Sequence, residues 1–291
     1  MALFLSVLTG ILFGFQSVLV KFALLQQTRL QVLKFLFFTA GILLLPFVWF
    51  KIPSVRILSF SVAFLISLSI NTVAYLLLFT ALKISPISIV MPYIGFTPLF
   101  LTLSAFLILG ENTGMASLSG ILLILMGGFI LQIPSAGLKK ANKFNIKHFF
   151  NRDEKGIFWA LTAAFLWSIS ASVEKIAVNS SSPEFYGASI HLTLGFVFLL
   201  LAKITSKEKK AKKNIKNYGM LLCIGIISAA LAFTQLTAIK LTQVSTVIAF
   251  KRAGILVSGL TGLIFFKEGH WFKTMTGTVL ILSGAILISL Y

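Results

Sequence analysis

Two adjacent cations, Lys251 and Arg252, lie inside the apolar run VIAFKRAGILVSGLTGLIFF of residues 247–266. A charged group at the centre of a membrane-spanning helix costs about 2.5–3.5 kcal/mol on insertion scales. The apolar segment begins near residue 244, so the cations lie about 10 Å from its start at about 1.5 Å per residue. Ordinary snorkelling cannot be assumed at this depth, so another group must compensate both charges.

An anionic solute is one way to compensate this pair. Arginine presents a planar fork of donors that matches carboxylate or phosphate, and lysine adds a second positive charge. The chain has seven acidic residues, and all except Glu174 fall in loops or near the ends of apolar runs. We therefore expect Lys251 and Arg252 to bind an organic anion or a phosphorylated solute. In the alternative interpretation, Glu174 and backbone carbonyls neutralise the pair, which then only holds helices together.

A polar stripe follows one face of the apolar run 156–178, where Trp167, Ser170 and Glu174 are spaced by three and four residues. An intramembrane carboxylate can take up a proton and couple transport to a gradient, which makes Glu174 a proton-coupling candidate. His191 is a second candidate, because imidazole changes its charge near physiological pH. The alternatives are a snorkelling or structural role for Glu174 and a packing contact for His191.

Other polar and aromatic side chains in mid-span are candidate solute ligands, and the alternative for each is a hydrogen bond to a neighbouring helix. The candidates, with Lys251 and Arg252, are Gln16, Asn71, Tyr75, Tyr93, Trp167 and Gln235. Pro86, Pro92 and Pro98 predict a kink around Tyr93, because proline removes backbone donors. Glu111 and Glu268, just before the last apolar run of each half, are expected to complement helix N-termini.

The composition places these residues in a membrane. The chain has 291 residues, of which 58% are hydrophobic and 11% charged, and its mean hydropathy is +1.00. Runs of about 20 apolar residues are long enough to span a bilayer, and their lack of period-2 alternation predicts helices. The ten runs are 3–24, 30–50, 57–82, 87–109, 115–133, 156–178, 185–202, 218–239, 244–266 and 272–290. The first run has no preceding cation and no cleavage pattern after it, so we expect a retained helix.

The second half of the chain repeats the first. An offset of 157 aligns Lys83, Glu111 and Gly120 with Lys240, Glu268 and Gly277, and an offset of 154 aligns Lys21 with Lys175. The pattern predicts a five-helix unit at 1–133, a basic linker at 134–155 and a second five-helix unit at 156–291. Because five is odd, the second unit must be inverted, which is the architecture of alternating access.

Two pairs of segments also resemble a known family. FTALKISPISIVMPYIGFTPLFLTLSAFLILGE with GILLILMGGFIL, and LTAIKLTQVSTVIAFKRAGILVSGLTGLIFFKE with GTVLILSGAILI, resemble the two EamA-type repeats of the drug/metabolite transporter superfamily. The resemblance implies a ten-helix transporter with a central cavity and leaves the solute open. The Lys251–Arg252 pair is also similar to one in the sugar-phosphate translocator branch, where such a pair is associated with the substrate phosphate.

The net charge of +18 is concentrated in two loops, residues 134–155 and 203–217. Basic loops between spans favour contact with the anionic headgroups of a lipid bilayer over nucleic-acid binding. When the loops between the ten spans are numbered along the chain, the odd-numbered loops carry 17 cations and the even-numbered ones 3. Because cytoplasmic loops carry an excess of Lys and Arg, this count places the odd-numbered loops in the cytoplasm and both termini outside. The family resemblance implies cytoplasmic termini instead, so the orientation is left open.

Several functions find no support in the sequence. A GxxxxGK[ST] phosphate loop is absent, and three histidines and one cysteine give no metal-ligand spacing, so we expect no ATP hydrolysis, metal, cofactor or enzymatic activity. The prediction is an all-α, multi-pass protein of the cell (inner) membrane that carries a small molecule by alternating access. The alternatives are a proton-coupled exporter of amino acids or drug-like amphiphiles and a non-transporting subunit or receptor. The oligomeric state is left open, with a homodimer among the alternatives.

Overall fold

The computed structural model describes residues 1–49, 54–111, 117–132, 152–205, 215–265 and 271–290. The helices of the first half are α1 (Ala2–Gln26), α2 (Arg29–Trp49), α3 (Ile57–Ile84), α4 (Ile87–Ile94), α5 (Thr97–Leu109) and α6 (Ser117–Gln132). Those of the second half are α7 (Arg152–Asn179), α8 (Pro183–Ile204), α9 (Ile215–Leu241), α10 (Val244–Arg252), α11 (Gly254–Phe265) and α12 (Trp271–Leu290). Eight of the described helical segments are long and apolar enough to cross a membrane.

The ten predicted spans are present, and the fourth and ninth are each built from two helices. In the fourth, α4 ends at Ile94 and α5 begins at Thr97. Pro92 and Pro98 flank this break, which confirms the kink expected from their missing backbone donors. In the ninth, α10 ends at Arg252 and α11 begins at Gly254.

The break in the ninth span was not predicted, because residues 244–266 contain no proline. The backbone nonetheless follows the fourth span. Leu99 N–H donates to the carbonyl of Phe96 at 3.0 Å, and the repeat-related Leu256 N–H donates to the carbonyl of Ala253 at 3.1 Å. Such three-residue turns are tighter than α-helix and interrupt it. Lys251 and Arg252 therefore lie at the C-terminal end of a short helix, where the helix dipole favours cations.

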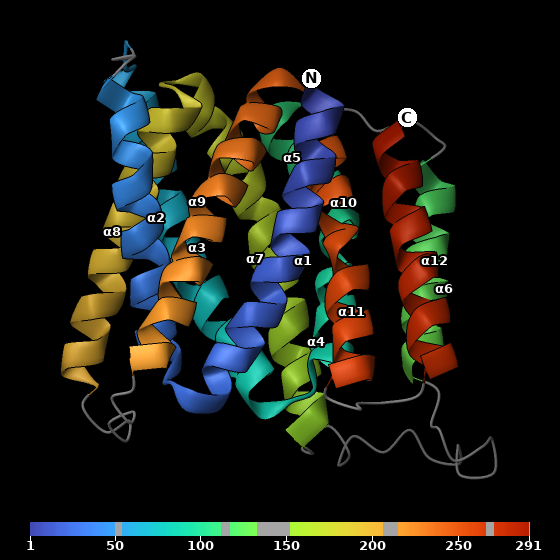
Figure 1. The fold of residues 1–291 in the computed structure, drawn as a ribbon. Helices are drawn as coiled ribbons and strands as arrows, with labels where there is room; N and C mark the ends of the chain where they lie inside the picture. The colour runs from blue at the N-terminus through green and yellow to red at the C-terminus, as the bar shows by residue number, and fades with distance from the viewer. Residues whose placement is uncertain (50–53, 112–116, 133–151, 206–214, 266–270, 291) are drawn as a thin grey trace.

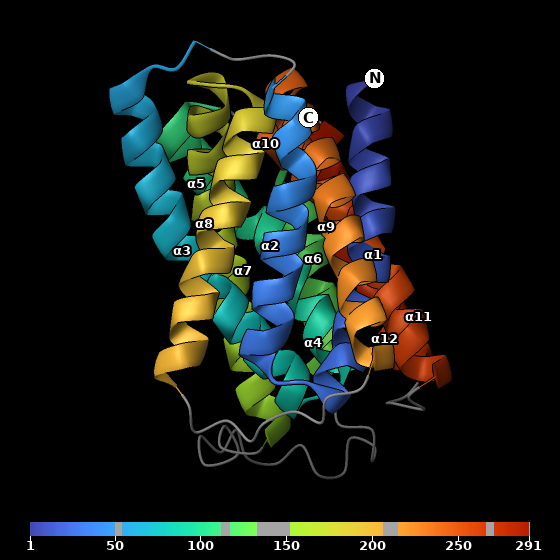
Figure 2. The same ribbon diagram turned by 60° about the vertical axis from the view of Figure 1, so that its left-hand side comes forward.

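The two halves run in opposite directions through the bundle. In Figure 1, α1 descends from the end that carries both termini, here called the terminal end, whereas α7 ascends from the opposite end. The most extensive helix packing joins α2 with α8, α3 with α7, α6 with α12 and α1 with α9. The inverted repeat explains this pattern. It exchanges α2 with α8 and α6 with α12, so each of these pairs maps onto itself, and it converts the α3–α7 pair into the α9–α1 pair. Figure 2 shows α2 and α8 side by side at the front of the bundle.

The contact between α6 and α12 is reciprocal. A Cβ on Gly127 would lie 2.6 Å from the carbonyl oxygen of Gly277, and one on Gly284 would lie 2.4 Å from that of Gly120. The offset of 157 relates Gly120 to Gly277 and Gly127 to Gly284. Each half therefore supplies the same small residues to bring the backbones close, a common device for packing helices in membranes.

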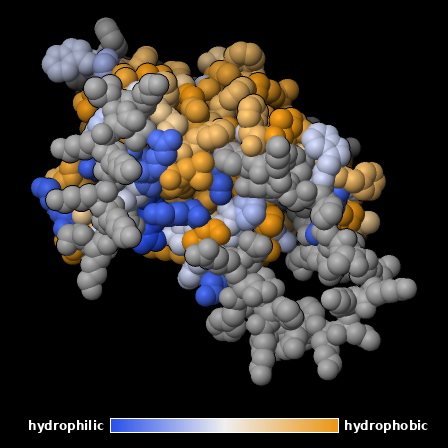
Figure 3. Space-filling view, turned by 60° about the horizontal axis from the view of Figure 1, so that its bottom comes forward, coloured by the Kyte–Doolittle hydropathy of each residue, from blue (hydrophilic) through white to orange (hydrophobic). Residues whose placement is uncertain are grey.

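The surface agrees with a protein that spans a bilayer. Large apolar side chains are exposed along the sides of the helices, among them Phe4, Phe15 and Leu65. Figure 3 brings forward the end opposite the termini and shows hydrophilic residues gathered there. Much of the predicted basic linker lies outside the described residues, as do residues 206–214 and Glu268, and the last part of the linker, 152–155, belongs to α7.

Candidate functional site

A cavity of about 610 Å³ of empty space, its opening included, lies between α2, α3, α7, α8, α9 and α10. It is lined by every candidate residue named above except Gln16 and Tyr93. The candidates in its wall are Asn71, Tyr75, Trp167, Glu174, His191, Gln235, Lys251 and Arg252. Residues from both halves of the chain therefore meet at one polar site inside an apolar bundle.

Arg252 is the largest fully buried side chain among the described residues, with 1% of its surface exposed. One terminal nitrogen, Nη2, donates to Thr97 Oγ1 at 2.9 Å. The rings of Phe13 and Trp167 lie 5.3 and 5.7 Å from the guanidinium carbon, within cation–π range. Nε and Nη1 are buried and have no hydrogen-bond partner among the described residues. The guanidinium of this cavity-wall residue thus has two nitrogens without a hydrogen-bond partner among the described residues.

Lys251 is joined to Glu174 through an amide. Its Nζ donates to Gln235 Oε1 at 2.6 Å, and Gln235 Nε2 donates to Glu174 Oε2 at a longer 3.4 Å. Lys251 also lies 5.1 Å from the centre of the Phe13 ring. Within the described part of the chain, Lys251 makes no direct ion pair with a carboxylate. Glu174 therefore offsets part of the positive charge of the cavity without forming a direct ion pair with Lys251.

Glu174 lies five residues before the end of α7 at Asn179, and its carboxylate faces the cavity. Its Oε1 accepts hydrogen bonds from Asn71 Nδ2 and Ser170 Oγ, both at 3.1 Å. Trp167 Nε1 donates to Asn71 Oδ1 at 3.1 Å, which fixes the orientation of this amide. These contacts place Glu174 in an internal network and do not fit the snorkelling alternative.

Aromatic rings, some of which carry a polar group, line another part of the cavity wall. Tyr75 lies edge-on to Trp167, with ring centres 5.0 Å apart, and to Phe37, at 4.8 Å. His191 packs on Phe37 at 5.4 Å, and its Nδ1 lies 2.8 Å from the carbonyl oxygen of Gly187. Because a carbonyl only accepts, Nδ1 must carry the hydrogen in this contact. One side of the imidazole is therefore satisfied by its own helix, as in the packing interpretation of His191.

Gln16 lines a second, smaller cavity of about 360 Å³, which shares Tyr75, Trp167 and Lys251 with the first. Gln16 Nε2 donates to Ser228 Oγ. The smaller cavity contains Val20 and Leu78, whose repeat counterparts in the larger cavity are Glu174 and Gln235. The two cavities are therefore related by the internal repeat, but Glu174 and Gln235 line only the larger one, whereas Lys251 lines both.

Tyr93 does not reach either of these cavities. It is 2% exposed and stacks on Phe96, with ring centres 6.0 Å apart, in the core beside the break between α4 and α5. The structure thus places Tyr93 outside these two cavities, and its binding of the solute stays a prediction. Phe13 was not among the candidates, although its repeat position matches that of Trp167 and could have identified it.

No group of three or more His, Cys, Asp or Glu side chains among the described residues is arranged to hold a metal ion. The site is instead a pocket of two cations, one carboxylate and several amides and aromatic rings. A binding pocket at the interface of two inverted repeats is the architecture of secondary transporters. The fold and this cavity thus define a polytopic membrane transporter.

Comparison with known proteins gives the family. The EamA-like transporter family matches residues 1–132 and 154–290, and the chain belongs to this family. A protein of Archaeoglobus fulgidus named "Uncharacterized transporter" is 25% identical over 217 residues, which cover 73% of this chain and 69% of that protein. A "Putative sugar uptake protein" of Lactobacillus johnsonii is 24% identical over 59% of this chain and 58% of its own.

A solved crystal structure also has this fold. The alignment covers 97% of this chain and 96% of the chain in that structure, with a TM-score of 0.67 and 16% sequence identity. At this identity the likeness concerns the fold alone. The transporter class follows from the family, and the solute has to be argued from the cavity.

Proposed function

We propose that this protein is a secondary transporter of the cell membrane that carries a small organic anion, either a carboxylate or a phosphorylated metabolite, by alternating access. Arg252 and Lys251 bind the anionic group of the solute. The supporting observation is that Arg252 is buried beside the cavity while its Nε and Nη1 have no partner among the described residues.

Burial of a charged donor without a hydrogen bond is costly. An oxygen of a carboxylate or phosphate would satisfy one of these guanidinium donors in a charge-assisted hydrogen bond. Lys251 could exchange its hydrogen bond to the neutral Gln235 oxygen for a second contact with the anionic group of the solute. The cavity contains two cations and one carboxylate, so an anion improves its charge balance.

Solute counterflow into liposomes tests this proposal. Purified protein would be reconstituted in vesicles loaded with inorganic phosphate, sugar phosphates or small carboxylates, and uptake of the same labelled solute would be measured. We expect saturable counterflow of at least one anion that other anions inhibit, and weak counterflow of uncharged sugars. Counterflow of neutral or cationic solutes alone would contradict the proposal.

Glu174 supports a second candidate function, which is proton-coupled transport of a solute that carries an amine. Its carboxylate shares the cavity with both cations and is linked to Lys251 through Gln235. A zwitterionic solute could place its anionic group at Arg252 and its ammonium near Glu174. The third alternative, a non-transporting subunit or receptor, has least support, because the chain belongs to a transporter family and has a cavity beside Lys251.

The variant Glu174→Gln should separate the two candidate functions. If the solute is an anion, loss of this negative charge should tighten anion binding about tenfold, since like charges in a partly buried site repel strongly. The dissociation constant would be measured by calorimetry in detergent. Glu184→Gln, in the first turn of α8 and outside the cavity wall, is the control and should change it little. Weaker binding together with loss of pH-driven uptake would favour the amine-bearing solute.

A further inference from the structure

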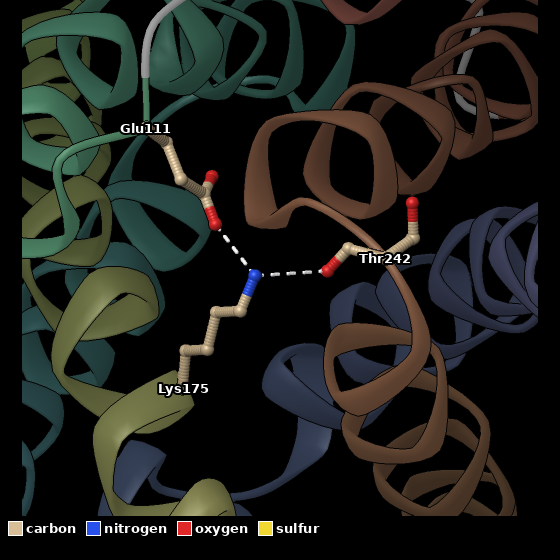
Figure 4. A network of polar contacts seen from close by, with 3 residues as sticks. All are labelled: Glu111, Lys175 and Thr242. Carbon is tan, nitrogen blue, oxygen red and sulfur yellow. Dashed lines mark hydrogen bonds and ion pairs between the residues drawn. The ribbon is translucent and has the colours of Figure 1, made fainter.

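A polar contact outside the cavity joins both halves of the chain. Lys175 Nζ lies 2.5 Å from Glu111 Oε1 and 3.1 Å from the carbonyl oxygen of Thr242. Figure 4 shows Lys175 reaching from α7 toward both partners. Glu111 lies two residues beyond the end of α5, and Thr242 lies between α9 and α10. One ammonium group thus connects three segments that are far apart in the sequence.

This contact lies between the cavity and the terminal end of the bundle. The end of α5, the last turns of α7 and the junction of α9 with α10 all lie at that end (Figure 1). Lys175 directly follows Glu174 of the cavity wall. Thr242 is seven residues beyond Gln235, or about 10 Å along the chain at about 1.5 Å per helical residue. The contact between these segments therefore lies on the terminal side of the cavity.

The ion pair between Lys175 and Glu111 has features of a contact that can break during a conformational change. The side chains of Lys175 and Glu111 are 18% and 11% exposed, so the pair is partly shielded from water and its attraction is weakly screened. Glu111 Oε2, however, is buried and has no partner among the described residues. A buried carboxylate oxygen without a hydrogen bond makes the closed contact less stable. If the contact opened, water could donate a hydrogen bond to this second oxygen.

The opposite end of the bundle has a related contact. Lys21, the repeat counterpart of Lys175, donates to the carbonyl oxygens of Leu82 and Ser85, both at 2.8 Å. Ser85 lies between α3 and α4 and is the repeat counterpart of Thr242. In each half, then, a lysine on the first helix holds the junction that precedes the two-part span. Because the halves are inverted, the two lysines act at opposite ends.

We propose that Lys175 and Glu111 are gating residues of the transport cycle, which close the cavity toward the terminal end when paired and open it when they separate. Lys21 holds the corresponding junction at the opposite end. This inference rests on the proposed alternating access, and it assigns the opening of one particular end to the separation of one particular ion pair.

Side-specific labelling of a cavity cysteine tests the gate without knowledge of the solute. Cys223 is the free cysteine of the described chain, and Cys223→Ser with Ala232→Cys places a new thiol in the cavity wall. A membrane-impermeant maleimide would be added to sealed vesicles of either orientation, and a tag on the N-terminus would identify the terminal side. Folding would be checked by size-exclusion chromatography.

We expect Lys175→Gln and Glu111→Gln to raise labelling from the terminal side about tenfold and to leave labelling from the other side unchanged or lower. Lys21→Gln should have the opposite sidedness. Lys240→Gln, which changes an exposed cation at the end of α9, is the matched control and should change neither rate. The exchange Lys175→Glu with Glu111→Lys should restore slow labelling, which a merely structural role of either residue alone would not predict.

Two outcomes would overturn the gate. One is unchanged labelling from both sides in the folded single variants, and the other is an equal increase from both sides. If Lys175→Gln does not fold, Glu111→Gln and Lys175→Arg take its place, and Lys175→Arg should keep the slow rate. A side-specific increase in a protein that fails to exchange any anion would support the gate and remove the proposed solute, so the two failures can be told apart.

Discussion

Arg252→Met is expected to abolish anion counterflow while leaving the protein at least as stable to thermal unfolding. Removal of one partner of a buried, charge-assisted contact typically costs about 2–5 kcal/mol, so counterflow should fall by at least about 30-fold. Methionine has no charge to desolvate, and a buried ionic group can often be replaced by an apolar one of similar volume without loss of stability. Unfolding in detergent and counterflow in liposomes would be measured on the same preparation.

Arg29→Met is the matched control for this experiment. Arg29 Nη1 donates to Thr80 Oγ1 at 2.6 Å, the same kind of contact that Arg252 makes with Thr97, but Arg29 lies outside the cavity wall. This variant should therefore keep anion counterflow. If Arg252→Met lost stability as well as transport, the structural interpretation of the cation pair would be favoured over the binding one.

Gly254→Ala should destabilise the folded protein by about 3 kcal/mol or more, at or above the upper end of the usual range for overpacking. A Cβ on Gly254 would lie 2.1 Å from the carbonyl oxygen of Gly10 and 2.7 Å from the backbone nitrogen of Gly14. Both obstacles are backbone atoms of α1, which cannot rotate away as a side chain can. The resulting shift would also move the end of α10 and therefore Arg252, so transport should be lost with stability.

The control lies on the same helix. A Cβ on Gly259 would meet its nearest atom, Met275 Cε, at an ordinary 3.7 Å, so Gly259→Ala should fold and transport normally. Chemical unfolding in detergent would compare the two variants. Equal stability of Gly254→Ala and Gly259→Ala would show that α1 and α11 can separate without cost, contrary to the close packing described above.

Much of the architecture could be predicted from the sequence because a membrane limits the choices. Apolar runs of spanning length have to be helices, and an odd number of spans in each repeat forces the inversion. Candidate site residues were found by a similar argument, since a polar side chain in a span is costly unless it faces the interior. Lys251, Arg252 and Glu174 were identified in this way and line one cavity.

The tertiary partners of these residues could not be predicted, because a periodic pattern gives the face of a helix and not its neighbour. Glu111 was expected to complement a helix N-terminus, and it pairs with Lys175 from the other half. Tyr93 was expected at the solute, and it is buried against Phe96 outside the two cavities. The break at Ala253 left no local signal, since the second repeat lacks the prolines of the first.

The unequal cavities have a consequence for energy. Where the larger cavity has a carboxylate and an amide, its repeat-related copy has the aliphatic groups of Val20 and Leu78. Duplication preserved the path of the backbone but not the chemistry along it. Two conformations of this bundle that a pseudo-twofold rotation relates would surround the same ligand with different dipoles, so we expect them to differ in energy and the loaded protein to favour one of them at rest.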